Sequence, residues 1–188
     1  PVPETAIVAI SIPSLLETTA DLIAHGVRRI LLEKPAGLDF DEIHRLRQLA
    51  EAAGAEVFVA YNRRFYASVR KARELAAEDG GVTSFFFEFT EWAHQIEGLD
   101  ISPAELENWF LANSTHVVDL AFFLGGAPRE LSSYTGGSLS WYSKASAFAG
   151  AGVSTTGAVF SYRANWESAG RWSVELQTKR RRLILCPL

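Results

Sequence analysis

The chain has 188 residues, of which 48% are hydrophobic and 21% charged, and its formal net charge is -4. This composition is typical of a globular protein with one large or two small domains, and it excludes a disordered chain. The acidic balance argues against a nucleic-acid partner, and no run reaches the roughly 18 apolar residues of a membrane span. The one cysteine, Cys186, excludes an intramolecular disulfide, is expected in the core and suits a reducing cytoplasm.

The first part of the chain alternates between strand and helix patterns. Residues 5–12 form a near-continuous apolar run, typical of a parallel strand covered on both faces, and further strands are predicted at 27–32 and 56–61. Strand, helix, strand, helix, strand with short links predicts right-handed crossovers and a parallel sheet. Residues 1–64 are therefore interpreted as one half of a dinucleotide-binding Rossmann domain.

Capping patterns mark the two helices between these strands. Ser14-Leu15-Leu16-Glu17 has the spacing of a capping box, and Asp39 with Glu42 repeats that spacing at the second helix. Gly26 and Gly54 are expected to end the two helices.

The character of the chain changes after residue 64. A linking helix is predicted at 66–79, an aromatic strand at 82–92, a loop or insertion at 93–108 and a helix at about 110–124. Strands are then expected at 129–135, 139–148, 153–163, 171–178 and 182–186. Residues 65–188 are accordingly predicted to form an α+β domain with a predominantly antiparallel sheet arranged as a meander.

Two local patterns in this second part are interpreted as turns. Gly150-Ala151-Gly152 lacks the third glycine and the following helix of a dinucleotide fingerprint, so it is interpreted as a hairpin turn. The basic cluster Lys179–Arg182 lies between two strand-like runs and is interpreted as a solvated hairpin turn.

Glu33-Lys34-Pro35 directly follows the second predicted strand. Ligands of open α/β sheets bind at the carboxyl ends of strands, and a lysine held there beside a proline suits a proton donor or acceptor. An exposed ion pair at a strand end remains the alternative.

The segment from Asn113 to Asp119 is the second candidate. In a helix, Asn113 and His116 would share a face, as would His116 and Asp119. Histidine exchanges protons near neutral pH, and a neighbouring carboxylate can fix its tautomer. A histidine that fills a packed helix is the alternative. The other histidines form no metal-ligand pattern with Cys186, and hydrolase and kinase motifs are absent from the sequence.

Taken together and in order, Glu33-Lys34-Pro35, Tyr61-Asn62-Arg63-Arg64-Phe65 and the helix with His116-Val117-Val118-Asp119-Leu120 resemble the glucose-fructose oxidoreductase, inositol dehydrogenase and rhizopine-catabolism (Gfo/Idh/MocA) family. The resemblance implies binding of NAD or NADP and hydride exchange with a CH–OH group of a sugar, cyclitol or sugar derivative. It also implies a homo-oligomer formed through the antiparallel sheet.

Site residues carry over from the same resemblance. Lys34 and His116 are the implied catalytic residues. The implied substrate-binding residues are Asn113, Asn62 and Arg63, and the implied cofactor-binding residues are Ser11, Pro13, Glu33, Lys34 and Pro35. No metal site is implied.

The sequence departs from the family pattern in two places. Ala112 stands where the family often has an aspartate, and Asn113 beside it cannot act as a base. The glycine-rich phosphate-binding turn is absent from the 188 residues, so the chain is expected to represent an incomplete enzyme that binds dinucleotide weakly. A non-catalytic protein that binds or oligomerises through its sheet is the alternative function.

Overall fold

A computed structural model describes residues 2–188. The chain forms two compact units that do not follow one another simply along the sequence. The first unit comprises the residues up to Tyr61 together with Ile101–Asn113, and the second unit comprises Asn62–Asp100 and Ser114–Leu188. The domain ranges 1–64 and 65–188 stay a prediction, which did not anticipate that Ile101–Asn113 groups with the first unit.

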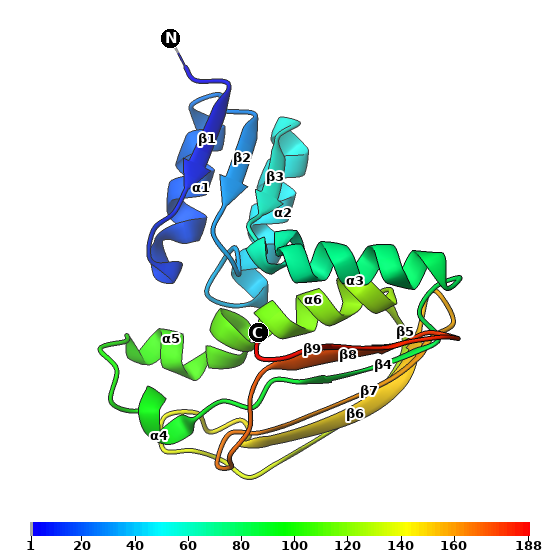
Figure 1. Ribbon diagram of the computed structural model, residues 1–188. Helices are drawn as coiled ribbons and strands as arrows, with labels where there is room; N and C mark the ends of the chain where they lie inside the picture. The colour runs from blue at the N-terminus through cyan, green and yellow to red at the C-terminus, as the bar shows by residue number, and fades with distance from the viewer. Residues whose placement is uncertain (1) are drawn as a thin grey trace. The chain divides into compact units, whose positions relative to one another are not determined.

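The first unit is built on a three-stranded parallel sheet in the order β1-β2-β3, which confirms the predicted partial Rossmann topology. The strands are β1 (Thr5–Val8), β2 (Arg29–Leu32) and β3 (Glu56–Val59). The helices α1 (Leu15–Ala24) and α2 (Phe40–Ala53) lie on one face of this sheet (Figure 1). Leu15, Ile30 and Leu32 are almost completely buried between the sheet and the helices.

The other face of the parallel sheet carries a row of exposed apolar side chains. Ile7 pairs with Leu31, and Leu31 pairs with Phe58, so the three lie side by side across the strands. Their exposed fractions are 73%, 41% and 51%. The expectation that the first strand is covered on both faces is wrong within residues 2–188, because Val8 is buried while its neighbour Ile7 is exposed.

The helix caps of the first unit follow the sequence in one case and not in the other. Asp39 accepts a hydrogen bond from the Glu42 amide at 2.9 Å, and the Glu42 carboxylate accepts one from the Leu38 amide at 2.6 Å. Gly54 ends α2 with φ at +62°. The prediction of a capping box at Ser14 is wrong. A 3-10 turn (Ile12–Ser14) runs directly into α1, so Ser14 is already helical and its side chain makes no capping bond.

The second unit contains a six-stranded sheet in the order β5-β6-β7-β4-β8-β9. Its strands are β4 (Ser84–Glu88), β5 (Pro128–Gly136), β6 (Ala147–Ser154), β7 (Val159–Asn165), β8 (Ser173–Gln177) and β9 (Arg182–Leu185). The sheet is predominantly antiparallel, as predicted, but it is not a simple meander. β4 lies between β7 and β8 and runs parallel to β7.

Helices cover one face of this sheet. α6 (Thr115–Gly125) packs on β4 and β8, and α3 (Ala67–Glu78) packs on β9 (Figure 1). Phe122 of α6 contacts three aromatic rings of the sheet edge to face, those of Phe85, Phe87 and Phe160. This aromatic layer is the core of the second unit.

Gly150-Ala151-Gly152 lies inside β6, so its interpretation as a hairpin turn is wrong. A Cβ on Gly150 would lie 2.4 Å from the Tyr162 ring, and one on Gly152 would lie 1.9 Å from the Glu130 carbonyl oxygen. Glycine is therefore required here for close approach rather than for turning the chain. The preceding segment, predicted as a strand at 139–148, is irregular until β6 begins at Ala147.

Three further expectations are resolved by the structure. The predicted loop 93–108 contains two short helices, α4 (Ala93–Ile96) and α5 (Pro103–Glu107). Cys186 is exposed rather than in the core, because it follows the last residue of β9. The basic cluster forms the turn between β8 and β9 as predicted, except that Arg182 is already the first residue of β9. None of the helices within residues 2–188 has the length and apolarity needed to cross a bilayer.

Candidate active site

Lys34 lies at the carboxyl end of the parallel sheet, as its sequence position predicts. The backbone ladder continues one residue beyond β2, since the Glu33 amide donates to the Val8 carbonyl at 2.8 Å. Lys34 Nζ donates a hydrogen bond to the Ala112 carbonyl oxygen at 2.5 Å. Ala112 belongs to the apolar core of the same unit, so the lysine side chain is tied to the segment Ile101–Asn113.

The turn after Lys34 has an unusual backbone conformation. Ala36 has φ at +82°, in the left-handed region that non-glycine residues rarely adopt, and it is only 3% exposed. Such a conformation persists only where surrounding packing holds it, and it is enriched at ligand-binding sites. The corner that presents Lys34 is therefore fixed by its surroundings.

The predicted cofactor-binding residues of the first unit lie at one edge of its sheet. Ser11 and Pro13 follow β1, and Glu33 with Pro35 follows β2. Because β1 and β2 are parallel and in register, both groups follow the carboxyl ends of adjacent strands. Ser11 and Pro13 are exposed, and Ser11 Oγ lies 3.4 Å from Ser14 Oγ.

In the second unit, His116 and Arg63 meet on a side chain that the sequence did not single out, Trp172. The His116 ring centroid lies 6.0 Å from that of the indole, and the Arg63 guanidinium lies 4.7 Å from the indole centroid. Arg63 Nε is buried and has no hydrogen-bond partner within residues 2–188. Trp172 directly precedes β8 and is far from Arg63 and His116 in the sequence, so no local pattern indicated it.

Asp119 does not serve as the partner of His116 that its helical spacing indicated. Its carboxylate accepts two hydrogen bonds from Arg64: one comes from Nε at 2.8 Å and the other from Nη2. Arg64 also stacks on Phe123, 4.8 Å from its ring centroid. Two parallel hydrogen bonds make this a specific geometry, so the pair fixes the turn Asn62–Phe65 to α6.

A buried carboxylate lies at the start of α6. Glu91 is 7% exposed, Ser114 is fully buried, and Ser114 Oγ donates to Glu91 Oε1 at 2.9 Å. A carboxylate near a helix N-terminus is favoured by the helix dipole. Glu91 lies in a segment predicted to be part of an aromatic strand, and its sequence context gave no signal of burial.

Asn113 lies in a π-helical turn (Phe110–Ser114) that precedes α6. The three-residue spacing of Asn113 and His116 assumed α-helical geometry, and the i→i+5 hydrogen bonds of a π-helix change that geometry. Single π-helical turns within α-helices are frequent at functional sites. Asn62 is exposed and begins the second unit directly after the last parallel strand.

The described residues also lack a cluster of metal ligands. Residues 2–188 contain no group of three or more His, Cys, Asp or Glu side chains placed to hold an ion.

Sequence comparison finds no matching family model and no matching curated protein. Solved structures do match. Levoglucosan dehydrogenase in complex with NADH and levoglucosan is 17% identical, with a TM-score of 0.76 over 97% of this chain. An oxidoreductase from Desulfitobacterium hafniense described as NADPH-dependent is 19% identical, with a TM-score of 0.75 over 94% of the chain.

The WlbA dehydrogenase from Bordetella pertussis, in complex with NADH and UDP-GlcNAcA, is 16% identical, with a TM-score of 0.74 over 94% of the chain. The structural neighbours are NAD-binding oxidoreductases of the Gfo/Idh/MocA type. At these identities the likeness establishes the fold. The chain spans about half the length of these neighbours, since it covers 54%, 52% and 53% of the three.

Proposed function

We propose that the chain is part of an NAD(P)-dependent oxidoreductase that acts on a CH–OH group of a sugar, cyclitol or related polyol. The observation that carries the proposal is Lys34, a fixed ammonium group at the carboxyl end of β2 in a fold shared with NAD-binding dehydrogenases. Fold alone does not define a reaction, so the proposal depends on this side chain and its setting.

The residues present fit one end of a dinucleotide. Lys34 offers a cationic donor and Ser11 an exposed hydroxyl, groups that suit the ribose and carboxamide of the nicotinamide half. No glycine-rich turn that would bind the pyrophosphate occurs in these 188 residues. When bound, NAD(P) would supply the hydride acceptor or donor.

The remaining chemistry is assigned to this chain's own side chains. Lys34 donates a hydrogen bond to the reacting oxygen and stabilises the charge that develops there. His116 exchanges a proton with the substrate near neutral pH, and its contact with Trp172 holds the imidazole in place. Arg63 and Asn113 orient hydroxyl groups of the substrate.

Saturation-transfer NMR with NADH and NADPH tests the cofactor assignment. We expect stronger saturation of nicotinamide and adjacent ribose protons than of adenine protons, and a loss of at least fivefold in Lys34→Met. Lys71→Met is the matched control, because Lys71 is exposed on α3 and forms a surface pair with Glu74. Absence of saturation with both nucleotides, or an unchanged signal in Lys34→Met, contradicts the proposal.

The second unit supports the proposed homo-oligomer. Tyr134, Val159 and Ile184 lie on the sheet face away from α6 and are 72%, 58% and 57% exposed. Exposed apolar groups on a broad sheet face favour association. One chain has a mass of 20.7 kDa. Light scattering should give a larger mass for the unsubstituted protein and a smaller one for Tyr134→Asp. A monomer at high micromolar concentration would contradict this part of the proposal and the sheet-mediated alternative function.

A further inference from the structure

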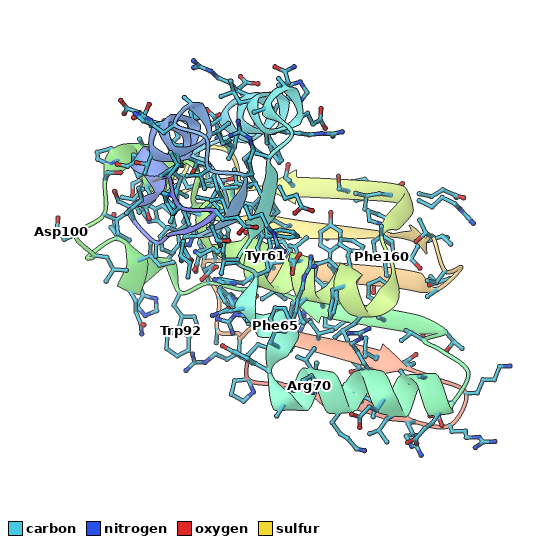
Figure 2. All side chains as sticks on the ribbon, turned by 90° about the horizontal axis from the view of Figure 1, so that it is seen from above. Tyr61, Phe65, Arg70, Trp92, Asp100 and Phe160 are labelled. Carbon is cyan, nitrogen blue, oxygen red and sulfur yellow. The ribbon has the colours of Figure 1, made fainter. Side chains whose placement is uncertain are left out.

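A pocket of about 560 Å³ opens at one end of the six-stranded sheet, entirely within the second unit. Three segments line it: residues 92–97 after β4, residues 139–141 before β6 and residues 166–169 after β7. Figure 1 shows α4 beside the loops at this end of the sheet. Figure 2 shows Trp92 near one end of the second unit's sheet. The volume suits a ligand of one or two rings.

Indole rings form much of the wall. Trp141 stacks on the buried Trp166 with 6.0 Å between ring centroids and 9° between planes. Trp92 Nε1 donates to the Gly170 carbonyl at 2.8 Å, and Trp166 Nε1 donates to the Phe89 carbonyl at 3.3 Å. Trp166 is only 1% exposed, so it supports Trp141 from the core side and does not itself reach a ligand. The Arg171 guanidinium lies over the Trp92 ring, 4.3 Å from its centroid, so Trp141 is the indole that offers apolar ring surface to a ligand.

Two carboxylates complete the lining. Glu97 accepts a hydrogen bond from Ser140 at 2.8 Å, and Glu167 accepts one from Ser146 at 2.5 Å. Within residues 2–188 neither carboxylate has a lysine or arginine nitrogen within 4.0 Å, and none of the lining residues is lysine or arginine.

Other glutamates of the same sheet are neutralised by arginine. Glu88 pairs with Arg163, and Glu175 pairs with Arg182. The pocket therefore combines the Trp141 ring with two carboxylates, Glu97 and Glu167, that accept hydrogen bonds from serine and form no ion pair with lysine or arginine in the described residues. An aromatic wall next to negative charge is the chemistry that recognises an organic cation.

We propose that this pocket binds a hydroxylated ring that carries a protonated amine, an amino sugar or an aminocyclitol. Trp141 contacts the C–H face of the ring, and Glu97 and Glu167 pair with the ammonium group and accept hydrogen bonds from hydroxyls. Phosphorylated and carboxylated sugars are disfavoured, because their charge has the same sign as the pocket's. The site requires no dinucleotide, so it stands independently of the proposed reaction.

Isothermal titration calorimetry on the full chain without dinucleotide tests the site with three probes. D-glucosamine carries the amine, N-acetyl-D-glucosamine has it capped, and D-glucose has a hydroxyl in its place. We expect glucosamine to bind about tenfold more tightly than either of the other sugars at pH 6, with the preference falling as salt is raised. Equal affinities for the three sugars, or no glucosamine binding at millimolar concentration, overturn the proposal.

Variants separate charge from ring contact. Glu97→Gln combined with Glu167→Gln should bring glucosamine to the affinity of glucose, and Trp141→Ala should weaken all three sugars at least fivefold. Glu130→Gln is the matched control, because it removes an exposed charge of the same unit outside the pocket. Circular dichroism confirms that each variant folds. A glucosamine preference that survives in the double glutamine variant also overturns the proposal.

Discussion

Arg64 and Asp119 depend on each other at the residue scale. The Asp119 side chain is only 13% exposed and Arg64 is 38% exposed, so removing the guanidinium leaves a mostly buried carboxylate without its counter-charge. We expect Arg64→Met to lower the free energy of unfolding by about 2 kcal/mol, between the small cost for an exposed pair and the larger cost for a fully buried one. Urea unfolding followed by tryptophan fluorescence measures the change.

The double variant distinguishes a coupled pair from two independent contacts. Arg64→Met with Asp119→Asn should cost less than the sum of the single substitutions, because neither group is then left uncompensated. Additive losses would show that the two side chains contribute separately. The matched control is Arg47→Met on α2, whose pair with Glu51 is exposed, so it should change the unfolding midpoint little.

At the scale of secondary-structure elements, β6 depends on its glycines. Gly152 lies opposite Leu131 in β5, next to an irregularity in the pairing between Pro128 and Glu130. A methyl group there would meet a backbone carbonyl, which cannot move aside as a flexible side chain can. We expect Gly152→Ala to lower the free energy of unfolding by about 2 kcal/mol or more. Ala151→Ser changes the neighbouring exposed position and should be nearly neutral.

The hairpin of β8 and β9 has a pH-dependent ion pair. Hydrogen bonds from Arg182 lower the pKa of Glu175. The Glu175 carboxylate accepts one hydrogen bond from Arg182 Nε at 2.8 Å and one from Nη2 at 2.7 Å. A depressed pKa stabilises the folded state above the unfolded pKa, and this contribution is lost as pH falls through the folded pKa. Glu175→Gln should therefore lower the urea midpoint at pH 7, and the difference from the unsubstituted chain should shrink as the pH is lowered from 5 towards 3. A difference that stays constant between pH 7 and pH 3 would assign the effect to packing.

Local patterns predicted some elements of this fold and could not predict others. Asp39 and Gly54 mark α2 because a capping carboxylate and a left-handed glycine act within a few residues. Gly150 and Gly152 led to a wrong prediction of a turn. The sequence does not show whether a glycine is needed for a positive φ in a turn or for close approach of another segment within a strand. Trp172 could not be assigned to the site from the sequence, because its contact with His116 joins residues far apart in the chain.

At the scale of the whole molecule, the exposed row of Ile7, Leu31 and Phe58 is the feature most open to test. A flat apolar row on a parallel sheet favours self-association of the chain. We expect Phe58→Lys to raise solubility and reduce the fluorescence of a hydrophobic dye without lowering the unfolding midpoint. Phe86→Lys is the control, because Phe86 is an aromatic side chain on a sheet face that is less exposed than Phe58. Equal dye binding by the unsubstituted chain and Phe58→Lys would contradict this prediction.

The position of β4 sets an order of events during synthesis. Residues 84–88 leave the ribosome long before their two partners, β7 at 159–163 and β8 at 173–177. Until those strands arrive, Phe85 and Phe87 belong to a segment with no neighbour on either side. Pairing between distant segments slows folding and prolongs the exposure of strand edges. The second unit should therefore complete its aromatic core only after β7 and β8 have emerged, and residues 84–88 remain an unpaired apolar segment until then.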